Sequence, residues 1–223
     1  MKNIIFVAPP AAGKGTLANL LKGKYHIPHI STGDILRSEI EKGGKYAEYI
    51  KEQINLGKLV SDDIIFELLT ERLSQSDCDN GYILDGFPRN LKQAEAYDEI
   101  LKKLNKDIGY VIVLDIDKEI AKKRIIGRLN CSNCGAVYNY MFEEMKPKKE
   151  GICDVCNNLL KRRDDDNEET FNKRYETYLE QTEPIIKYYE DKGVLYRINS
   201  GKGKEYAFTE IEKIINQKEL NSD

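Results

Sequence analysis

The chain has 223 residues, enough for one compact domain with small insertions and a sizeable buried core. Hydrophobic residues make up 40% and charged residues 33%, and 35 basic against 38 acidic side chains leave a net charge of −3. This balance excludes a strong overall field that would draw the chain to nucleic acid or to an acidic membrane. No apolar run is long enough for a secretory signal or a transmembrane helix, so we expect a cytoplasmic protein.

Strand and helix patterns alternate along the first half of the chain. The short apolar runs are β-branched and bounded by turn residues, whereas the longer segments place leucine and isoleucine at helical spacing. The segment 29–34 is expected to end a short strand and open a helix, with short helices beginning near Gly33 and Tyr46. The other predicted elements are strand 2–7, helix 15–24, helix 62–74, strand 82–84, helix 91–104, strand 110–116 and helix 117–128.

The pattern breaks between residues 129 and 160, where cysteine, glycine, proline and lysine dominate. We interpret this segment, the cysteine module, as an insertion. A long polar helix over 168–191, a strand over 194–198, a helix over 208–215 and a frayed tail over 217–223 complete the prediction. Strands that alternate with helices predict an α/β fold with a mostly parallel sheet covered on both faces.

The segment APPAAGKGT, residues 8–16, lies between the first strand and the first helix, the setting in which a phosphate-binding loop occurs. Its backbone N–H groups can surround phosphate oxygens, and the helix N-terminus adds partial positive charge. Lys14 supplies a point charge for the β- and γ-phosphates. The usual pattern has glycine where Ala8 stands, so a plain glycine-containing strand–helix turn is the alternative.

Three further clusters follow predicted strands or turns. They are HISTGD over 29–34 with Arg37 one turn later, GKLV over 57–60, and GYILDGFPR over 81–89. Ligands of open parallel sheets bind at the carboxyl ends of the strands, so Asp85 is placed to hold Mg²⁺ through water. The alternatives are a turn or capping role for Asp85 and a solvated surface position for Arg37 and Arg89. We expect His26 and His29 to flank a strand without a catalytic role.

Four of the five cysteines form two C-x2-C pairs, Cys131 with Cys134 and Cys153 with Cys156, separated by 18 residues. This spacing is typical of a tetrahedral zinc site, and four protein ligands would make the ion structural. Free thiols or disulfides are the alternatives, and Cys78 stands apart as an ordinary core or surface residue. Lysines and arginines near the module also suggest nucleic-acid binding, but such a run of charges is usually a solvated face, and a hinged lid explains the position of the module between two arginine-bearing helices better.

Taken together, the motifs GKGT, STGD-x-x-R, GKLV and DGFPR-x-x-x-Q resemble those of adenylate kinase, and the resemblance covers nearly the whole chain. The four-cysteine insertion resembles the zinc-bearing lid of the long bacterial form. The resemblance implies a P-loop nucleoside monophosphate kinase fold, with a core over 1–30, 61–127 and 165–223, a helical AMP-binding domain over 31–60 and a lid over 128–164. It also implies Mg²⁺-dependent conversion of ATP and AMP to two ADP by a monomer without nucleic-acid or membrane partners.

The resemblance assigns roles to individual residues. The ATP-binding residues would be Ala11, Ala12, Gly13, Lys14, Gly15, Thr16, Arg124, Arg128, Tyr138 and Lys202. The AMP-binding residues would be Thr32, Gly33, Arg37, Lys58, Leu59, Val60, Gly86, Phe87, Arg89, Gln93, Arg163 and Arg174. The catalytic residues would be Lys14, Asp85, Arg89, Arg128, Arg163 and Arg174. Zinc would be held by Cys131, Cys134, Cys153 and Cys156.

The chain departs from the family pattern at Ala8 and Ala11, where glycine is usual, and at Leu17, where glutamine is usual. Alanine in a left-handed conformation costs on the order of 1 kcal/mol, and a methyl group near the β-phosphate could displace the ligand. We therefore predict weakened nucleotide binding or turnover relative to the glycine form. Two other functions stay open: a kinase for UMP, CMP or another monophosphate, and a non-catalytic nucleotide-binding or zinc-ribbon protein.

Overall fold

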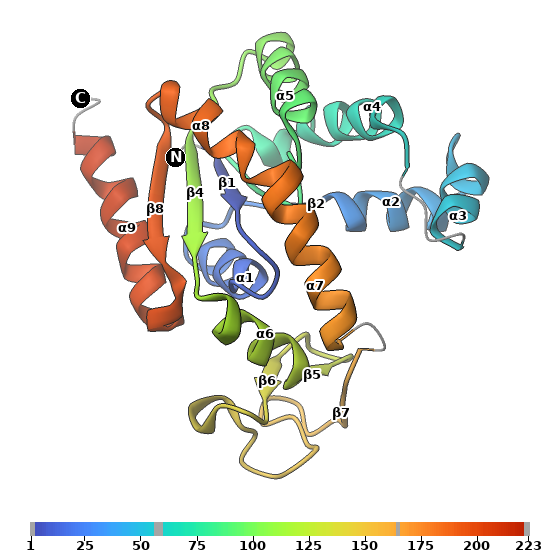
Figure 1. The fold of residues 1–223 in the computed structure, drawn as a ribbon. Helices are drawn as coiled ribbons and strands as arrows, with labels where there is room; N and C mark the ends of the chain where they lie inside the picture. The colour runs from blue at the N-terminus through green and yellow to red at the C-terminus, as the bar shows by residue number, and fades with distance from the viewer. Residues whose placement is uncertain (1–2, 56–59, 164–165, 221–223) are drawn as a thin grey trace.

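The computed structural model describes residues 3–55, 60–163 and 166–220. Five parallel strands form the central sheet in the order β2-β3-β1-β4-β8 (Figure 1). Their bounds are β1 Ile4–Val7, β2 His29–Ser31, β3 Ile83–Asp85, β4 Tyr110–Asp115 and β8 Leu195–Asn199. The predicted parallel sheet is thus confirmed, because each strand returns to the sheet through a helical crossover.

Helices cover both faces of the sheet. Ile4 and Phe6 of β1 pack against α1 (Lys14–Tyr25) and α9 (Lys204–Leu220), whereas Ile5 and Val7 pack on the opposite face. That second face carries α4 (Asp62–Leu73), α5 (Leu91–Leu104) and α8 (Pro184–Asp191). Successive side chains of a strand point to opposite faces of the sheet, and helices bury both faces. These short strands are therefore apolar on both sides.

Two smaller units extend from this core (Figure 1). Helices α2 (Thr32–Glu41) and α3 (Ala47–Asn55) follow β2 and share a separate hydrophobic cluster that includes Ile50, Val60 and Leu68. The cysteine module lies beyond α6 (Lys118–Ile126) and forms an antiparallel sheet in the order β6-β5-β7. Its strands are short: β5 Arg128–Cys131, β6 Val137–Asn139 and β7 Leu160–Lys161.

Three sequence predictions are wrong in their bounds. Arg128 belongs to β5 and not to the end of the preceding helix. The single helix over 168–191 is divided into α7 (Glu168–Thr177), a π-helical turn over Tyr178–Thr182 and α8. Pro184 explains the break, since proline has no N–H for the helical ladder and crowds the carbonyl four residues earlier.

The C-terminal helix is also longer than predicted. Residues 204–220 form α9, so 217–220 are helical and not a frayed tail. Ala207, Ile211 and Ile215 recur every four residues on its buried face, against α1 and β8. Single-turn 3₁₀ segments occur at Ser76–Cys78, Glu143–Met145 and Ser200–Lys202. Among the described residues, no helix has the length and apolar character needed to cross a membrane.

Candidate nucleotide site

The loop between β1 and α1 presents backbone to an open cavity. Gly13 adopts a left-handed conformation with φ 94° at the start of α1, a value that favours glycine. A Cβ added at Gly13 or Gly15 would meet nothing within 4 Å, so space adjoins both backbones. The N-terminus of α1 lies there and favours anions. These features suit the phosphate-binding interpretation of residues 8–16.

The two unusual alanines of the loop have different surroundings. Ala11 has φ 62°, the left-handed conformation in which alanine is strained. Its side chain packs partly buried against Ala121, Ile125 and Phe171. Ala8 is absent from the positive-φ residues and is buried in the core cluster with α1 and α9. The predicted backbone strain therefore applies to Ala11, and a glycine at Ala8 would remove a buried methyl group.

A Lys–Asp–His cluster marks the carboxyl ends of the central strands. Lys14 Nζ lies 3.5 Å from Asp85 Oδ1, and His29 Nε2 lies 3.5 Å from Asp85 Oδ2. Burial disfavours the Asp85 carboxylate, but His29 and Lys14 together outweigh this effect and lower its pKa. Asp85 ends β3 and so does not cap a helix. Its ionised oxygens at the cavity wall are the ligand type that Mg²⁺ prefers.

One cavity of about 1900 Å³ brings most of the predicted residues together. This volume exceeds the roughly 300–1,000 Å³ of an ordinary small-molecule site, so it has room for more than one nucleotide. Its lining contains the predicted ATP-binding and catalytic residues. Arginines enter it from four segments: Arg89 after β3, Arg124 and Arg128 around the end of α6, Arg163 before α7, and Arg174 on α7. Such a density of guanidinium groups suits several phosphates.

Arg89 is held close to the Lys–Asp–His cluster. Its Nε donates to the Gly86 carbonyl at 2.7 Å. Burial lowers the pKa of Arg89, the Asp85 charge opposes this effect, and the nearby Arg174 charge adds to it. Gly86 has φ 79°, and a Cβ there would approach Arg89 and Thr32 within 3.3 Å. The backbone conformation therefore favours glycine at position 86, and a Cβ there would also require the Arg89 and Thr32 side chains to shift slightly.

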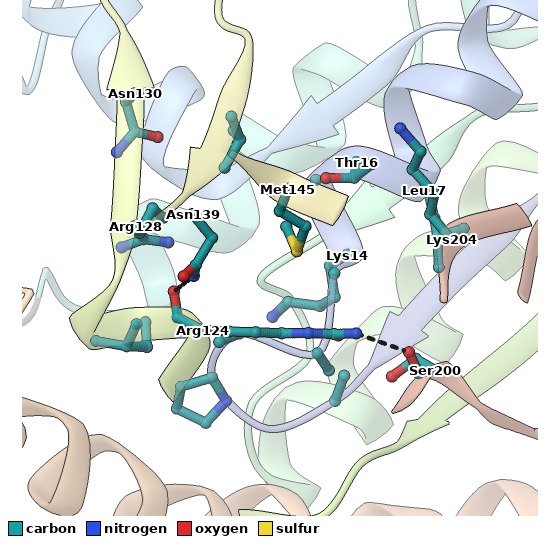
Figure 2. Close-up of a pocket in the computed structure, with 18 of the residues that line it drawn as sticks. Lys14, Thr16, Leu17, Arg124, Arg128, Asn130, Asn139, Met145, Ser200 and Lys204 are labelled. Carbon is teal, nitrogen blue, oxygen red and sulfur yellow. Dashed lines mark hydrogen bonds between the residues drawn. The ribbon is translucent and has the colours of Figure 1, made fainter. Parts of the chain in front are cut away.

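Arg124 extends across the cavity above the loop, with Lys14 nearby (Figure 2). Its Nη2 donates to the Ser200 carbonyl at 3.2 Å, and burial lowers its pKa. Asn139 donates to the Arg124 carbonyl at 2.9 Å and so joins the end of α6 to β6. Lys202 lies in the same wall, but its Nζ sits 4.8 Å from the ring centre of Tyr206. The flat guanidinium of Arg124, held by the Ser200 carbonyl, can stack on a nucleotide base.

Asp166 is a site residue that the sequence did not reveal. Its side chain is 0% exposed and accepts two hydrogen bonds from Arg128, at 2.8 Å from Nε and 2.5 Å from Nη2. Arg128 also lines the cavity, so Asp166 fixes the orientation of an arginine predicted to meet phosphate. In the sequence, Asp166 ends a run of three aspartates that looks like a solvated face, and only tertiary packing distinguishes it.

Of the predicted AMP-binding residues that the structure describes, Gly86, Arg89, Arg163 and Arg174 line this cavity and the others do not. Thr32 lines a small adjoining depression, and its hydroxyl donates to the Gly86 carbonyl at 3.4 Å. Arg37 is exposed and paired with Asp34, and Gly33 lies against Arg37. Phe87 and Val60 are buried in hydrophobic clusters. Lys58 and Leu59 lie outside the described residues.

Gln93 is buried, and both ends of its amide bind protein. Its Oε1 accepts from the Arg89 backbone at 2.8 Å, and its Nε2 donates to Asp62 at 2.8 Å. The structure therefore places Gln93 beside the turn that carries Arg89 but does not bring it into the large cavity. An adenine contact would require one of these two hydrogen bonds to change partner.

The four module cysteines converge. Their sulfur atoms all lie within 4.8 Å of one another, with Cys131 and Cys156 at 3.3 Å and Cys134 and Cys153 at 3.5 Å. Tetrahedral zinc with bonds of about 2.3 Å needs sulfur atoms about 3.8 Å apart, so the cluster fits this ion. All are free thiols, as is buried Cys78. A hydrogen bond from Asn158 lowers the pKa of Cys156 to about 5, which favours the metal-binding thiolate.

Comparisons with known proteins identify relatives over nearly the full length. The family model described as adenylate kinase matches residues 6–194. A protein named adenylate kinase from Archaeoglobus fulgidus is 48% identical over 96% of this chain and 97% of its own. Another, from Thermosipho africanus, is 44% identical over 96% of this chain and 99% of its own. The chain therefore belongs to the adenylate kinase family of nucleoside monophosphate kinases.

Proposed function

We propose that the chain transfers a phosphoryl group reversibly from Mg²⁺-bound ATP to AMP and so produces two molecules of ADP. The observation that carries this proposal is the single cavity that joins Lys14 to arginines from four segments. Phosphoryl transfer requires mainly the alignment of two phosphate groups and the neutralisation of their charge. The family of the chain supports the same reaction.

On the donor side, we assign the phosphates of ATP to residues 11–16 and to Arg128. Backbone N–H groups of the loop would bind the oxygens, and Lys14 would reach the transferred phosphate. Arg124 would stack on the adenine, with Tyr138 and the backbone near Lys202 completing the site. Asp85 would hold Mg²⁺ through water, and the ion would neutralise phosphate charge.

On the acceptor side, we assign AMP to the turn that carries Gly86, Phe87 and Arg89 and to the neighbouring α2 segment with Thr32, Gly33 and Arg37. Lys58, Leu59, Val60 and Gln93 complete this assignment. In the transfer step, an anionic oxygen of the AMP phosphate forms a bond to the γ-phosphorus of ATP while the bond to the bridging β–γ oxygen breaks. The acceptor oxygen needs no general base because it carries no proton to remove.

Arg89, Arg128, Arg163 and Arg174 would neutralise the transferring group. Arg163 lies between β7 and α7, and Arg174 lies on α7. We propose that residues 128–164 form a lid that closes over ATP, residues 31–60 form the AMP-binding domain, and residues 1–30, 61–127 and 165–223 form the core. Closure would exclude water, so phosphate would pass to AMP instead of being hydrolysed.

We further propose that one structural zinc ion occupies the four-cysteine cluster. The sulfur spacing supports zinc, and the four ligands leave no open coordination position for catalysis. Stoichiometric zinc is expected in the purified protein by elemental analysis. Substoichiometric metal after purification without chelators would contradict the assignment.

A substrate panel tests the proposed reaction. The purified protein, expected to be a monomer by light scattering, is assayed with Mg²⁺-ATP and AMP, GMP, UMP or CMP. Rapid ADP formation with AMP alone supports the proposal. Preference for another monophosphate would show that the acceptor base is misassigned. This outcome is worth testing because both ends of the Gln93 amide already bind protein groups. Absence of turnover with all four would contradict a catalytic function.

A further inference from the structure

Tyr138 lies between the nucleotide cavity and the cysteine cluster. Its strand β6 pairs with β5, with Tyr138 opposite Leu129, and the side chain lines the large cavity. At its far end, the hydroxyl lies 3.6 Å from Cys153 Sγ. The Asp154 backbone N–H also donates to this hydroxyl, at 2.8 Å. A single side chain thus contacts two sites that have different ligands.

The contact with Asp154 leaves the hydroxyl proton of Tyr138 free for a second hydrogen bond. A tyrosine hydroxyl donates one proton and accepts through its lone pairs. Because the Asp154 N–H already occupies an acceptor position, the hydroxyl proton is available for Cys153 Sγ. A zinc-bound cysteine is a thiolate, which accepts such a hydrogen bond more strongly than a neutral thiol does.

We propose that Tyr138 couples the zinc site to ATP binding. Its hydroxyl donates to the Cys153 thiolate and stabilises the bound metal, and this contact holds the ring in position as a wall of the ATP cavity. The inference rests on the proposed zinc and ATP sites. It gives Tyr138 a positioning role that extends beyond its contact with nucleotide.

A hydrogen bond from the Tyr138 hydroxyl would offset part of the negative charge of the metal site. Four thiolates around Zn²⁺ leave a net charge of −2, which donors to sulfur reduce. Asn158 Nδ2 lies 3.4 Å from Cys156 Sγ and supplies one such donor, and Tyr138 supplies another to Cys153, the other cysteine of the same C-x2-C pair. Loss of an outer hydrogen-bond partner of a metal ligand typically changes metal affinity by about 10–100-fold.

Coupling of the two sites has a reciprocal consequence. If zinc orders the Tyr138 ring for ATP, then bound ATP must strengthen zinc binding by the same factor, because the two binding free energies are linked. ATP should therefore slow or reduce the loss of zinc from the wild-type protein. Removal of the hydroxyl should weaken both zinc retention and this protection.

The test uses the full-length, zinc-loaded protein with Tyr138→Phe and the matched control Tyr140→Phe. Tyr140 lies just beyond β6, but its hydroxyl donates to the Ile126 carbonyl at 3.3 Å. Zinc transfer to a competing chromogenic chelator is followed without nucleotide and with saturating ATP in the absence of AMP. Circular dichroism at saturating zinc establishes that each variant is folded.

Tyr138→Phe is expected to weaken zinc binding about 10–100-fold, whereas Tyr140→Phe retains the wild-type affinity. ATP is expected to protect zinc in the wild type and to protect it less in Tyr138→Phe. Equal zinc affinity of Tyr138→Phe and wild type would overturn the inference alone, as would ATP that binds the wild type without changing zinc retention. A wild-type protein that takes up no zinc would overturn the zinc assignment as well, and one that binds no ATP would overturn the proposed function.

Discussion

At the residue scale, Ala8 contributes buried packing, whereas Ala11 carries backbone strain. Ala8 is buried without a positive φ, whereas Ala11 is in the left-handed region. Ala8→Gly should lower the free energy of unfolding by about 1–2 kcal/mol, because it removes a buried methyl group and adds backbone entropy. Ala11→Gly should cost less, since relief of about 1 kcal/mol of strain offsets the same entropy. Urea unfolding measures both, and a larger loss for Ala11→Gly would contradict the prediction.

The same loop gives a prediction for ligand binding. The double variant Ala8→Gly, Ala11→Gly should raise ATP affinity or turnover, because it frees the loop backbone to approach phosphate more closely. Calorimetric titration with ATP and initial-rate kinetics measure the change. Kinetics and affinity unchanged from the wild type would show that the alanines do not weaken this site.

Asp166 gives a second prediction at this scale. Asp166→Asn removes the charge that holds Arg128 in a buried, doubly hydrogen-bonded pair, so we expect a loss of about 3 kcal/mol in unfolding free energy. Asp115→Asn is the matched control, because Asp115 forms the same two-bond contact with Arg197, and the side chains of Asp115 and Arg197 are 41% and 54% exposed, respectively. That exposed pair should contribute less than about 1 kcal/mol. Equal losses for the two variants in urea unfolding would refute the role of burial.

These residues also show what the sequence could predict. Lys14, Asp85 and Arg89 were found because turn chemistry and strand ends place them at one edge of a parallel sheet. Asp166 was missed because its burial depends on how α7 meets the cysteine module, which a run of three aspartates in the sequence does not reveal. His29 was expected to flank a strand, but it is the first residue of β2, and its contact with Asp85 follows from strand register and not from local sequence.

At the element scale, periodicity located most segments. Helix α5 was predicted to the residue, because its apolar spacing is regular and Asn90 caps its first turn. The errors occur where a local pattern is weak or a breaker was overlooked. The first residues of α9 are polar and show no apolar helical spacing, so they were not predicted as helix. The helix is stabilised where Ala207, Ile211 and Ile215 pack against the core. Pro184 divides α7 from α8. The helical pattern on both sides of this proline predicted a single helix, so the break was missed.

The cysteine module should depend on its metal. Its strands have four, three and two residues, too few to bury a substantial core of their own. Removal of zinc with a chelator should therefore abolish amide protection in β5 and β6, while β1 and β4 stay protected. Hydrogen exchange with mass spectrometry measures both regions in one sample. Unchanged protection of β5 and β6 after verified metal removal would contradict a structural role for zinc.

At the scale of the whole molecule, several separate segments of the chain contribute to one cavity. The central sheet supplies the phosphate loop and Asp85, α6 and the cysteine module supply Arg124 and Arg128, and α7 supplies Arg174. Because these groups come from separate segments, relative movement of the segments can assemble or disperse the charge that neutralises phosphate. Positive charge therefore gathers locally around this cavity although the net charge of the chain is −3.

Product stoichiometry tests the central claim most directly. Purified zinc-loaded protein is mixed with Mg²⁺-ATP and AMP, and ³¹P NMR follows ATP, ADP and inorganic phosphate. We predict that two ADP form for each AMP consumed, that the reaction reverses from ADP, and that inorganic phosphate stays at the level of a protein-free control. Release of inorganic phosphate without ADP formation from AMP, or no change in any of these species, would contradict phosphoryl transfer between nucleotides.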